Sequence, residues 1–121
     1  AGPGLVRQVL VAQAAGEVRG FLAYQQVVDL ATLLDVAVLP DYQGRGLAAA
    51  LMQAGLAAMR AGGAQRCELE VRASNHRAIA LYLACHFVED GVRTGYYAAS
   101  EGRENALLMS ANLGGVGNEC A

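Results

Sequence analysis

The sequence predicts one α/β domain of the α+β kind, with a mixed, mostly antiparallel central sheet, one parallel pair of strands and flanking helices. Two observations predict this class. Apolar segments with strand and helix periodicity follow one another in the order strands, helix, strand, helix, strands, without an internal repeat or linker. The length of 121 residues suits a single domain. We place this domain at residues 1–113 and expect a flexible tail at residues 114–121.

The first three strands are expected to form an antiparallel meander. Two valine-rich apolar segments flank the turn Ala14-Ala15-Gly16-Glu17, and a third segment ends at Pro40-Asp41. The three predicted strands are Leu5 to Ala12, Val18 to Val27 and Ala31 to Val38.

A helix is expected from Leu47 to Arg60, because this segment has almost no strand-forming residues and stops at Gly62-Gly63. Gly55 inside this helix should cost about 1 kcal/mol relative to alanine. The helix is predicted to carry an apolar stripe at Leu47, Leu51, Ala54 and Ala58.

The second half of the chain continues with a strand, a helix and closing strands. Arg66 to Arg72, RCELEVR, alternates apolar and polar residues as a strand does. Ser74 is a suitable N-cap for a helix from Asn75 to about Cys85. The closing strands are expected around the turn Ser100-Glu101-Gly102-Arg103, at Phe87 to Val92, Thr94 to Tyr97 and Ala106 to Ala111.

The composition argues against several classes of protein. Nine basic and eleven acidic residues lack the electrostatic footprint of a nucleic-acid binder. No uncharged apolar run approaches the ~20 residues of a membrane span. The three cysteines have no zinc-site spacing, so we expect reduced thiols and no metal. Because no secretory leader is recognisable, we expect a cytoplasmic protein that binds neither nucleic acid nor membrane.

The stretch PDYQGRGLAAAL, residues 40–51, leads a glycine-rich turn directly into the first helix. The first N–H groups of a helix have no intrahelical acceptor, and the positive end of the helix dipole lies behind them, so they attract phosphate. Gly44 and Gly46 leave the backbone open to an anion, and Gln43 and Arg45 add side-chain donors. An ordinary turn into a helix remains the alternative.

Polar side chains in the next strand and helix indicate a second part of a site. Glu68 and Glu70 lie two residues apart on one face of their strand, and a cleft beside Glu70 would explain a carboxylate there. Asn75 and Tyr82 share one stripe of the second helix. Each has a structural alternative, since asparagine is common at a helix start and tyrosine is common in a core.

Together these residues resemble the Gcn5-related N-acetyltransferase (GNAT) superfamily, whose acetyl-CoA motif reads here Gln43-Gly44-Arg45-Gly46-Leu47-Ala48. The segments DVAVLPDYQGRGLAAAL, LEVRASNHRAIALY and YYAASEGRENALLM are similar to the RimI type, which acetylates the N-terminal alanine of a ribosomal protein. The resemblance runs from about Phe21 to Leu113. It implies an acyl-CoA N-acyltransferase fold, here without the usual N-terminal strand and two helices.

The resemblance also implies roles for individual residues. Glu70 matches the general base and Tyr82 the general acid that protonates the departing CoA thiolate, with no metal. Asn75 would contact the cofactor, acetyl-CoA. The pantetheine arm and acetyl carbonyl would meet the main chain of Val36, Ala37 and Val38, and the pyrophosphate would be held by Gln43, Gly44, Arg45, Gly46, Leu47 and Ala48.

The expected reaction is direct attack of an N-terminal α-amine on the acetyl thioester. An α-amine has a pKa of about 7.7 to 8.0, so roughly a tenth is unprotonated near pH 7, and a modest base suffices. The acceptor is expected to be a basic ribosomal protein, flanked by residues that an ordinary hairpin loop would also explain: Tyr96, Tyr97, Glu101 and Glu104. The alternatives are acetylation of lysine or a small-molecule amine, or a truncated, non-catalytic acyl-CoA-binding module.

Three positions depart from the family pattern. His86 precedes Phe87 where glycine is usual, Ala98 replaces a proline, and Asn105 stands where aspartate is common. These changes bear on the rigidity of the loops and on the choice of peptide rather than on cofactor binding.

Overall fold

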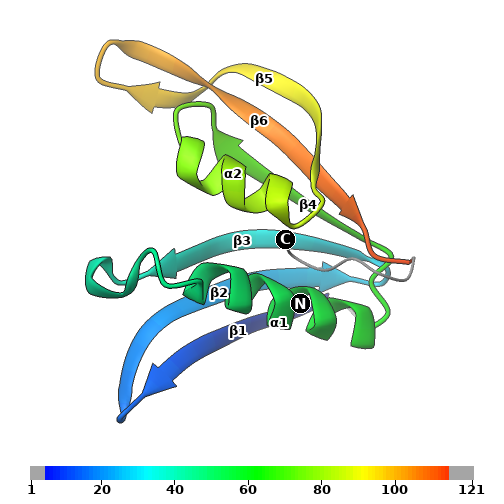
Figure 1. Ribbon diagram of the computed structural model, residues 1–121. Helices are drawn as coiled ribbons and strands as arrows, with labels where there is room; N and C mark the ends of the chain where they lie inside the picture. Colours follow the sequence, from blue (N-terminus) through cyan, green and yellow to red (C-terminus); the bar gives the residue numbers. More distant parts are fainter. Residues whose placement is uncertain (1–4, 115–121) are drawn as a thin grey trace.

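The computed structural model describes residues 5–114, and the predicted tail beyond Gly114 lies outside them. The order of the six strands in the sheet is β1-β2-β3-β4-β6-β5. Figure 1 shows this sheet with both helices on one of its faces. The elements are β1 Leu5–Ala14, β2 Glu17–Val27, β3 Leu30–Val38, the 3-10 turn η1 Pro40–Tyr42, α1 Leu47–Ala61, β4 Arg66–Arg72, α2 His76–Ala84, β5 Val88–Ala99 and β6 Gly102–Asn112.

The mixed sheet predicted from the sequence is confirmed. β1, β2 and β3 form the antiparallel meander, and β3 pairs with β4 in parallel. The prediction was wrong in the last strands, because the segments predicted at Phe87 to Val92 and Thr94 to Tyr97 form one strand, β5, which begins only at Val88. Its pairing with β6 shifts register between Glu89 and Gly91 and again between Arg93 and Tyr97. These irregularities break the alternation that the sequence reading relied on.

The core lies between the sheet and the two helices. Leu22 of β2, Cys67 of β4 and Met109 of β6 are each at most 1% exposed within one apolar cluster. The predicted stripe of α1 was wrong in part. Leu51 is buried but Ala54 is exposed, and the buried face consists of Leu51, Met52, Gly55, Leu56 and Met59.

Gly55 occupies the point where α1 comes closest to β2. A Cβ atom at this position would lie 2.9 Å from both Cδ atoms of Leu22, which is itself fully buried. Close packing of α1 on the sheet at this position therefore offsets the unfavourable helix propensity of glycine.

We expect Gly55→Val to lower the free energy of unfolding by about 2 kcal/mol, because its side chain overpacks the contact with Leu22. Chemical denaturation measures the change. Ala57→Val on the exposed side of the same helix is the matched control for the β-branched side chain. Equal losses in the two variants would contradict the role assigned to this contact.

The start of α2 differs from the sequence prediction. Asn75, not Ser74, is the N-cap, and its Oδ1 accepts a hydrogen bond from the N–H of Ala78 at 3.3 Å. The N–H of Ser74 instead donates to Glu104 of β6 at 2.7 Å. The helix therefore begins one residue later than the sequence predicts, and Ser74 lies in the loop before it.

The other face of the sheet carries no helix within residues 5–114 (Figure 1). Along β4, Cys67, Leu69 and Val71 are buried toward the helices, so the intervening Glu68 and Glu70 point to the opposite face. Cys67 is a free thiol as expected, whereas Cys85 is disulfide-bonded, which contradicts the expectation for that residue. Neither helix of the described chain has the length and apolar character needed to span a membrane.

Candidate active site

The glycine turn presents unpaired backbone donors at the start of α1. Gly46 is the N-cap with φ +78°, and Gly44 has the same φ value, so both occupy the left-handed region that favours glycine. No side chain caps the helix. The first intrahelical bond runs from Ala50 N–H to Gly46 O, which leaves the N–H groups of Leu47, Ala48 and Ala49 without an intrahelical acceptor.

These donors open into a cavity of about 600 Å³ between the turn, the end of β3 and the start of α2. We call it the carrier cavity. Its lining includes all but one of the residues predicted to bind the cofactor, namely Val36, Ala37, Val38, Gln43, Gly44, Gly46, Leu47, Ala48 and Asn75. The exception is Arg45, which lines a neighbouring cavity of about 310 Å³ together with Arg19 and Tyr42.

The end of β3 turns backbone groups toward this cavity. Leu39 N–H donates to Arg19 O at 2.9 Å, so Ala37 and Phe21 form the next hydrogen-bonded pair of the antiparallel ladder. The N–H and C=O groups of Val36 and Val38 therefore point away from β2. β4 does not cover them, because it pairs with β3 only at Leu30, Ala31 and Thr32.

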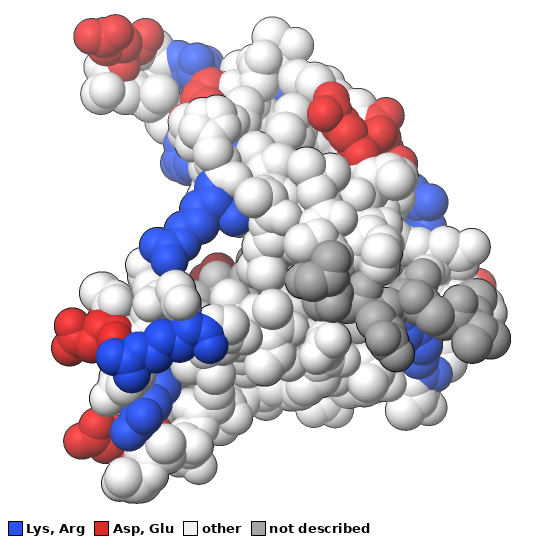
Figure 2. Space-filling model, viewed as in Figure 1, with Lys and Arg blue, Asp and Glu red and all other residues white. Residues whose placement is uncertain are grey.

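The sequence reasoning missed a charged residue of the carrier cavity, Arg77, together with the uncharged lining residues Tyr42, Ala49, Ala78, Ala80 and Leu81. Arg77 in the first turn of α2 donates from Nη1 to Gln43 Oε1 at 2.6 Å, and Gln43 Nε2 donates to Val38 O at 3.0 Å. The sequence did contain a signal for this residue, because Arg77 is a cation only two positions after Asn75, the predicted cofactor contact. Figure 2 shows basic side chains bordering a hollow on the side of the molecule where η1 and the start of α2 lie.

Glu70 lies just beyond the point where β3 and β4 separate. The last paired residues are Thr32 and Glu68, and past them the two strands diverge (Figure 1). Glu70 lines a second cavity, of about 700 Å³, on the helix-free face, which we call the acceptor cavity. Its Oε1 accepts a hydrogen bond from Arg93 Nη1 at 2.8 Å, and this ion pair fixes the direction of the carboxylate.

Tyr82 lies on the helix side of β4, so Glu70 and Tyr82 point to opposite faces of the sheet. Tyr82 is only 7% exposed and packs on Phe87 with 5.9 Å between ring centroids. Burial raises the pKa of Tyr82 to about 12, and the carboxylate of Asp35 on β3 contributes further to this increase. The phenol therefore keeps its proton throughout the neutral range, and the two side chains can act on one molecule only through the separation between β3 and β4.

The β5–β6 hairpin borders the acceptor cavity. Tyr97 lines this cavity with Glu70, and burial followed by the charge of Glu70 raises the pKa of Tyr97. Tyr96 packs edge-on against Tyr97 at 5.0 Å. Arg93 stacks over Tyr96 at 4.1 Å and Arg72 over Tyr97 at 4.5 Å.

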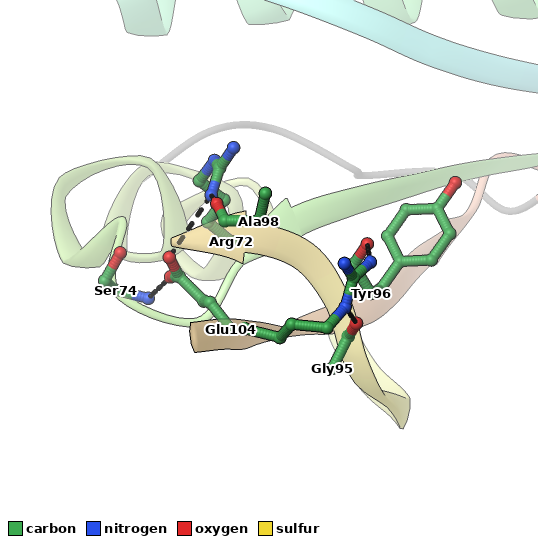
Figure 3. A network of polar contacts seen from close by, with 7 residues as sticks. Arg72, Ser74, Gly95, Tyr96, Ala98 and Glu104 are labelled. Carbon is green, nitrogen blue, oxygen red and sulfur yellow. Dashed lines mark hydrogen bonds and ion pairs between the residues drawn. The ribbon is translucent and has the colours of Figure 1, made fainter. Parts of the chain in front are cut away.

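Glu104, predicted to flank the acceptor, ties this hairpin to the loop before α2 (Figure 3). It accepts hydrogen bonds from Ser74 N–H and from Arg72 Nη1, the latter at 3.3 Å. The bonds from Ser74, and then Arg72, hold the pKa of Glu104 below its ordinary value. Arg72 also donates to Ala98 O at 2.9 Å, and Arg103 donates to the carbonyls of Gly95 and Tyr96.

Asn105, which stands where aspartate is common, still supplies a side-chain oxygen that accepts a hydrogen bond. Its Oδ1 accepts a hydrogen bond from Gly95 N–H at 3.0 Å. His86, where glycine is usual, adopts φ +68°. Within residues 5–114, no group of three or more His, Cys, Asp or Glu side chains is arranged to hold a metal ion.

Comparison with known proteins identifies relatives of this chain. The model of the acetyltransferase (GNAT) family matches residues 4–87. The [ribosomal protein bS18]-alanine N-acetyltransferase of Escherichia coli K12 is 43% identical over 95 residues, which are 78% of this chain and 64% of that protein. A putative enzyme of the same description from Bacillus subtilis is 33% identical over 100 residues, which are 83% of this chain and 65% of that protein. The chain thus spans less than two thirds of these relatives.

Solved structures give the same result. The crystal structure of the ribosomal-protein-S18-alanine N-acetyltransferase from Escherichia coli matches with a TM-score of 0.84 and 36% identity, covering 100% of this chain and 77% of that one. Nourseothricin acetyltransferase matches with a TM-score of 0.79 and 32% identity, covering 92% of this chain and 66% of that one.

Proposed function

Since the chain belongs to the acetyltransferase (GNAT) family, we propose that it transfers an acetyl group from acetyl-CoA to the N-terminal α-amine of a protein. The proposed acceptor is the alanine of a basic ribosomal protein, by similarity to relatives described as bS18-alanine N-acetyltransferases. The domain at residues 1–113 would act in the cytoplasm, where ribosomal proteins are made.

The observation that carries this proposal is the separation of β3 from β4 between two cavities. On one side, the free donors of the glycine turn and of β3 suit the diphosphate and the amide-containing pantetheine arm. On the other side, Glu70 and Tyr97 line a cavity wide enough for a peptide end. A thioester lying in this separation is accessible from both faces, so the acetyl donor and the amine can meet there without either entering the core.

The reaction forms a carbon–nitrogen bond and breaks the carbon–sulfur bond, and one proton passes from the amine while another reaches the sulfur. The amine nitrogen attacks the carbonyl carbon of the thioester, and Glu70 takes the amine proton, directly or through a water molecule. An oxyanion develops on the carbonyl oxygen. We propose that it accepts a hydrogen bond from the N–H of Val38, which points away from β2. The carbon–sulfur bond then breaks, and the departing thiolate receives a hydrogen bond and a proton from Tyr82. Tyr82 regains a proton from solvent and Glu70 releases the amine proton to solvent, which restores the enzyme.

The mixture of charges in the acceptor cavity favours a peptide over a small cation. Arg66 pairs with Asp90 at 3.2 Å and with Glu68 at 3.7 Å, and Arg93 pairs with Glu70 at 2.8 Å. All three carboxylates of the lining therefore already have guanidinium partners. Tyr97 and Leu34 supply apolar surface on the same lining. A peptide N-terminus brings main-chain donors, acceptors and side chains that suit such a lining better than an isolated ammonium group.

An intact-mass assay tests the proposal. The protein is incubated with acetyl-CoA and a basic peptide that begins with alanine, and we expect one added acetyl group on the α-amine. The same peptide with a blocked N-terminus and a free lysine is the control, because lysine with a pKa of about 10.4 is almost wholly charged at pH 7. Acetylation of the lysine peptide alone would favour the alternative acceptor class. Binding of acetyl-CoA without acetylation of any amine would favour a non-catalytic module.

A further inference from the structure

Arg77 is the only charged residue that lines the carrier cavity, whose lining lies entirely within residues 5–114. The other lining residues are apolar or neutral: besides Tyr42, Gln43 and Asn75, they are glycines, alanines, valines and leucines. A cavity of this kind offers one positive charge to an anion, and that charge comes from α2 rather than from the glycine turn.

The guanidinium of Arg77 makes no ion pair in the part of the chain that the structure describes. Its recorded partner is a neutral amide, the side chain of Gln43, at 2.6 Å. Gln43 in turn donates to Val38 O at 3.0 Å. This bridge crosses from the start of α2, past the glycine turn, to the end of β3, along the edge of the cavity where the free N–H groups of α1 emerge.

Arg45, the cation of the glycine turn itself, lies near the ring of Tyr42. Its guanidinium carbon lies 5.4 Å from the ring centroid of Tyr42, and Arg19 stacks on the same ring at 4.3 Å. Arg45 lines the neighbouring cavity and not the carrier cavity. In this structure Arg77 of α2 therefore places its charge at the carrier cavity, and Arg45 of the glycine turn does not.

We propose that Arg77 is a phosphate-binding residue of the carrier cavity, which exchanges the amide of Gln43 for a phosphate oxygen of the incoming ligand. A charge-assisted bond from arginine to phosphate is stronger than one to a neutral amide, so the exchange favours the bound state. The free N–H groups of Leu47, Ala48 and Ala49 would contact the same group. The choice of a diphosphate carrier as ligand rests on the proposed function.

Titration calorimetry with three probes tests the proposal at one fixed salt concentration. CoA carries a diphosphate and a 3′-phosphomonoester, dephospho-CoA keeps only the diphosphate, and pantetheine has no phosphate. We expect Arg77→Gln to weaken binding of CoA and of dephospho-CoA by about tenfold each, with no change for pantetheine. If Arg77→Gln weakens the binding of CoA but not of dephospho-CoA, Arg77 contacts the 3′-phosphomonoester instead of the diphosphate.

Two further variants complete the test. Arg7→Gln removes an exposed arginine of β1 outside the lining of either cavity and controls for net charge. Arg77→Lys keeps the charge without the planar fork and should recover part of the affinity. Equal affinity of wild type and Arg77→Gln for CoA would overturn the role of Arg77. Failure of the folded wild type to bind CoA would instead count against the proposed function.

Discussion

Replacement of Glu70 by glutamine is expected to lower turnover at pH 7 by about 100-fold, because the variant loses the proton acceptor proposed for the attacking amine. The structure provides for this role in two ways. Glu70 follows the last paired residue of β4, Glu68, by two positions, at the opening between β3 and β4. Its carboxylate is oriented by Arg93 at 2.8 Å and faces the acceptor cavity.

The pH dependence distinguishes a base from a structural residue. As pH rises toward about 9, the α-amine loses its own proton, so the ratio of wild-type to Glu70→Gln turnover should shrink. Steady-state rates at saturating acetyl-CoA measure this ratio. Glu68→Gln is the matched control, since Glu68 lies on the same face and lines the same cavity but pairs with Arg66 at 3.7 Å. A ratio that stays constant with pH would argue against proton abstraction by Glu70.

Tyr82→Phe is expected to lower turnover by about tenfold or more, because the departing thiolate loses a charge-assisted hydrogen bond. With its pKa raised to about 12 by burial, the phenol remains protonated well above the pH at which the amine becomes free. The wild-type rate should therefore show no decline from this group below about pH 10. Rates measured under conditions where chemistry limits turnover test this expectation.

A second buried tyrosine serves as the control for Tyr82. Tyr24 of β2 is 4% exposed, and burial also raises its pKa. Neither Tyr24 nor Tyr82 is in the lining of the carrier or acceptor cavity, and the proposed reaction gives Tyr24 no role. Tyr24→Phe should leave turnover close to that of wild type. If both variants lose activity equally and also unfold at lower temperature, the effect of Tyr82→Phe belongs to the core and not to the leaving group.

The two expected effects depend on a single feature of the sheet. Because Glu70 points to the helix-free face and Tyr82 of α2 is buried on the helix side, a sheet with continuous pairing between β3 and β4 would keep them apart. Pairing stops after three residue pairs, from Leu30 with Arg66 to Thr32 with Glu68. The early divergence of two parallel strands leaves an opening beside Glu70, through which we propose that both side chains reach the thioester.

Local patterns determined much of this protein. The alternation of RCELEVR fixed which side chains of β4 face the helices, and the spacing of glycines placed the left-handed turn before α1. Both depend on neighbours within a few residues. The order of strands and helices, the parallel pair and the identity of most residues around the carrier cavity followed from such patterns and from the family resemblance.

Long-range contacts decided the rest, because they bring together residues whose separation no local pattern encodes. Glu104 of β6 accepts a hydrogen bond from the N–H of Ser74, 30 positions earlier in the sequence, and so ties the β5–β6 hairpin to the loop before α2. Leu22 lies so close to α1 that a side chain at position 55 would clash with it, so glycine is required on the buried side of the helix there. Arg77 reaches Gln43 across 34 positions of sequence, so its place in the cavity emerges only when α2 packs beside the glycine turn.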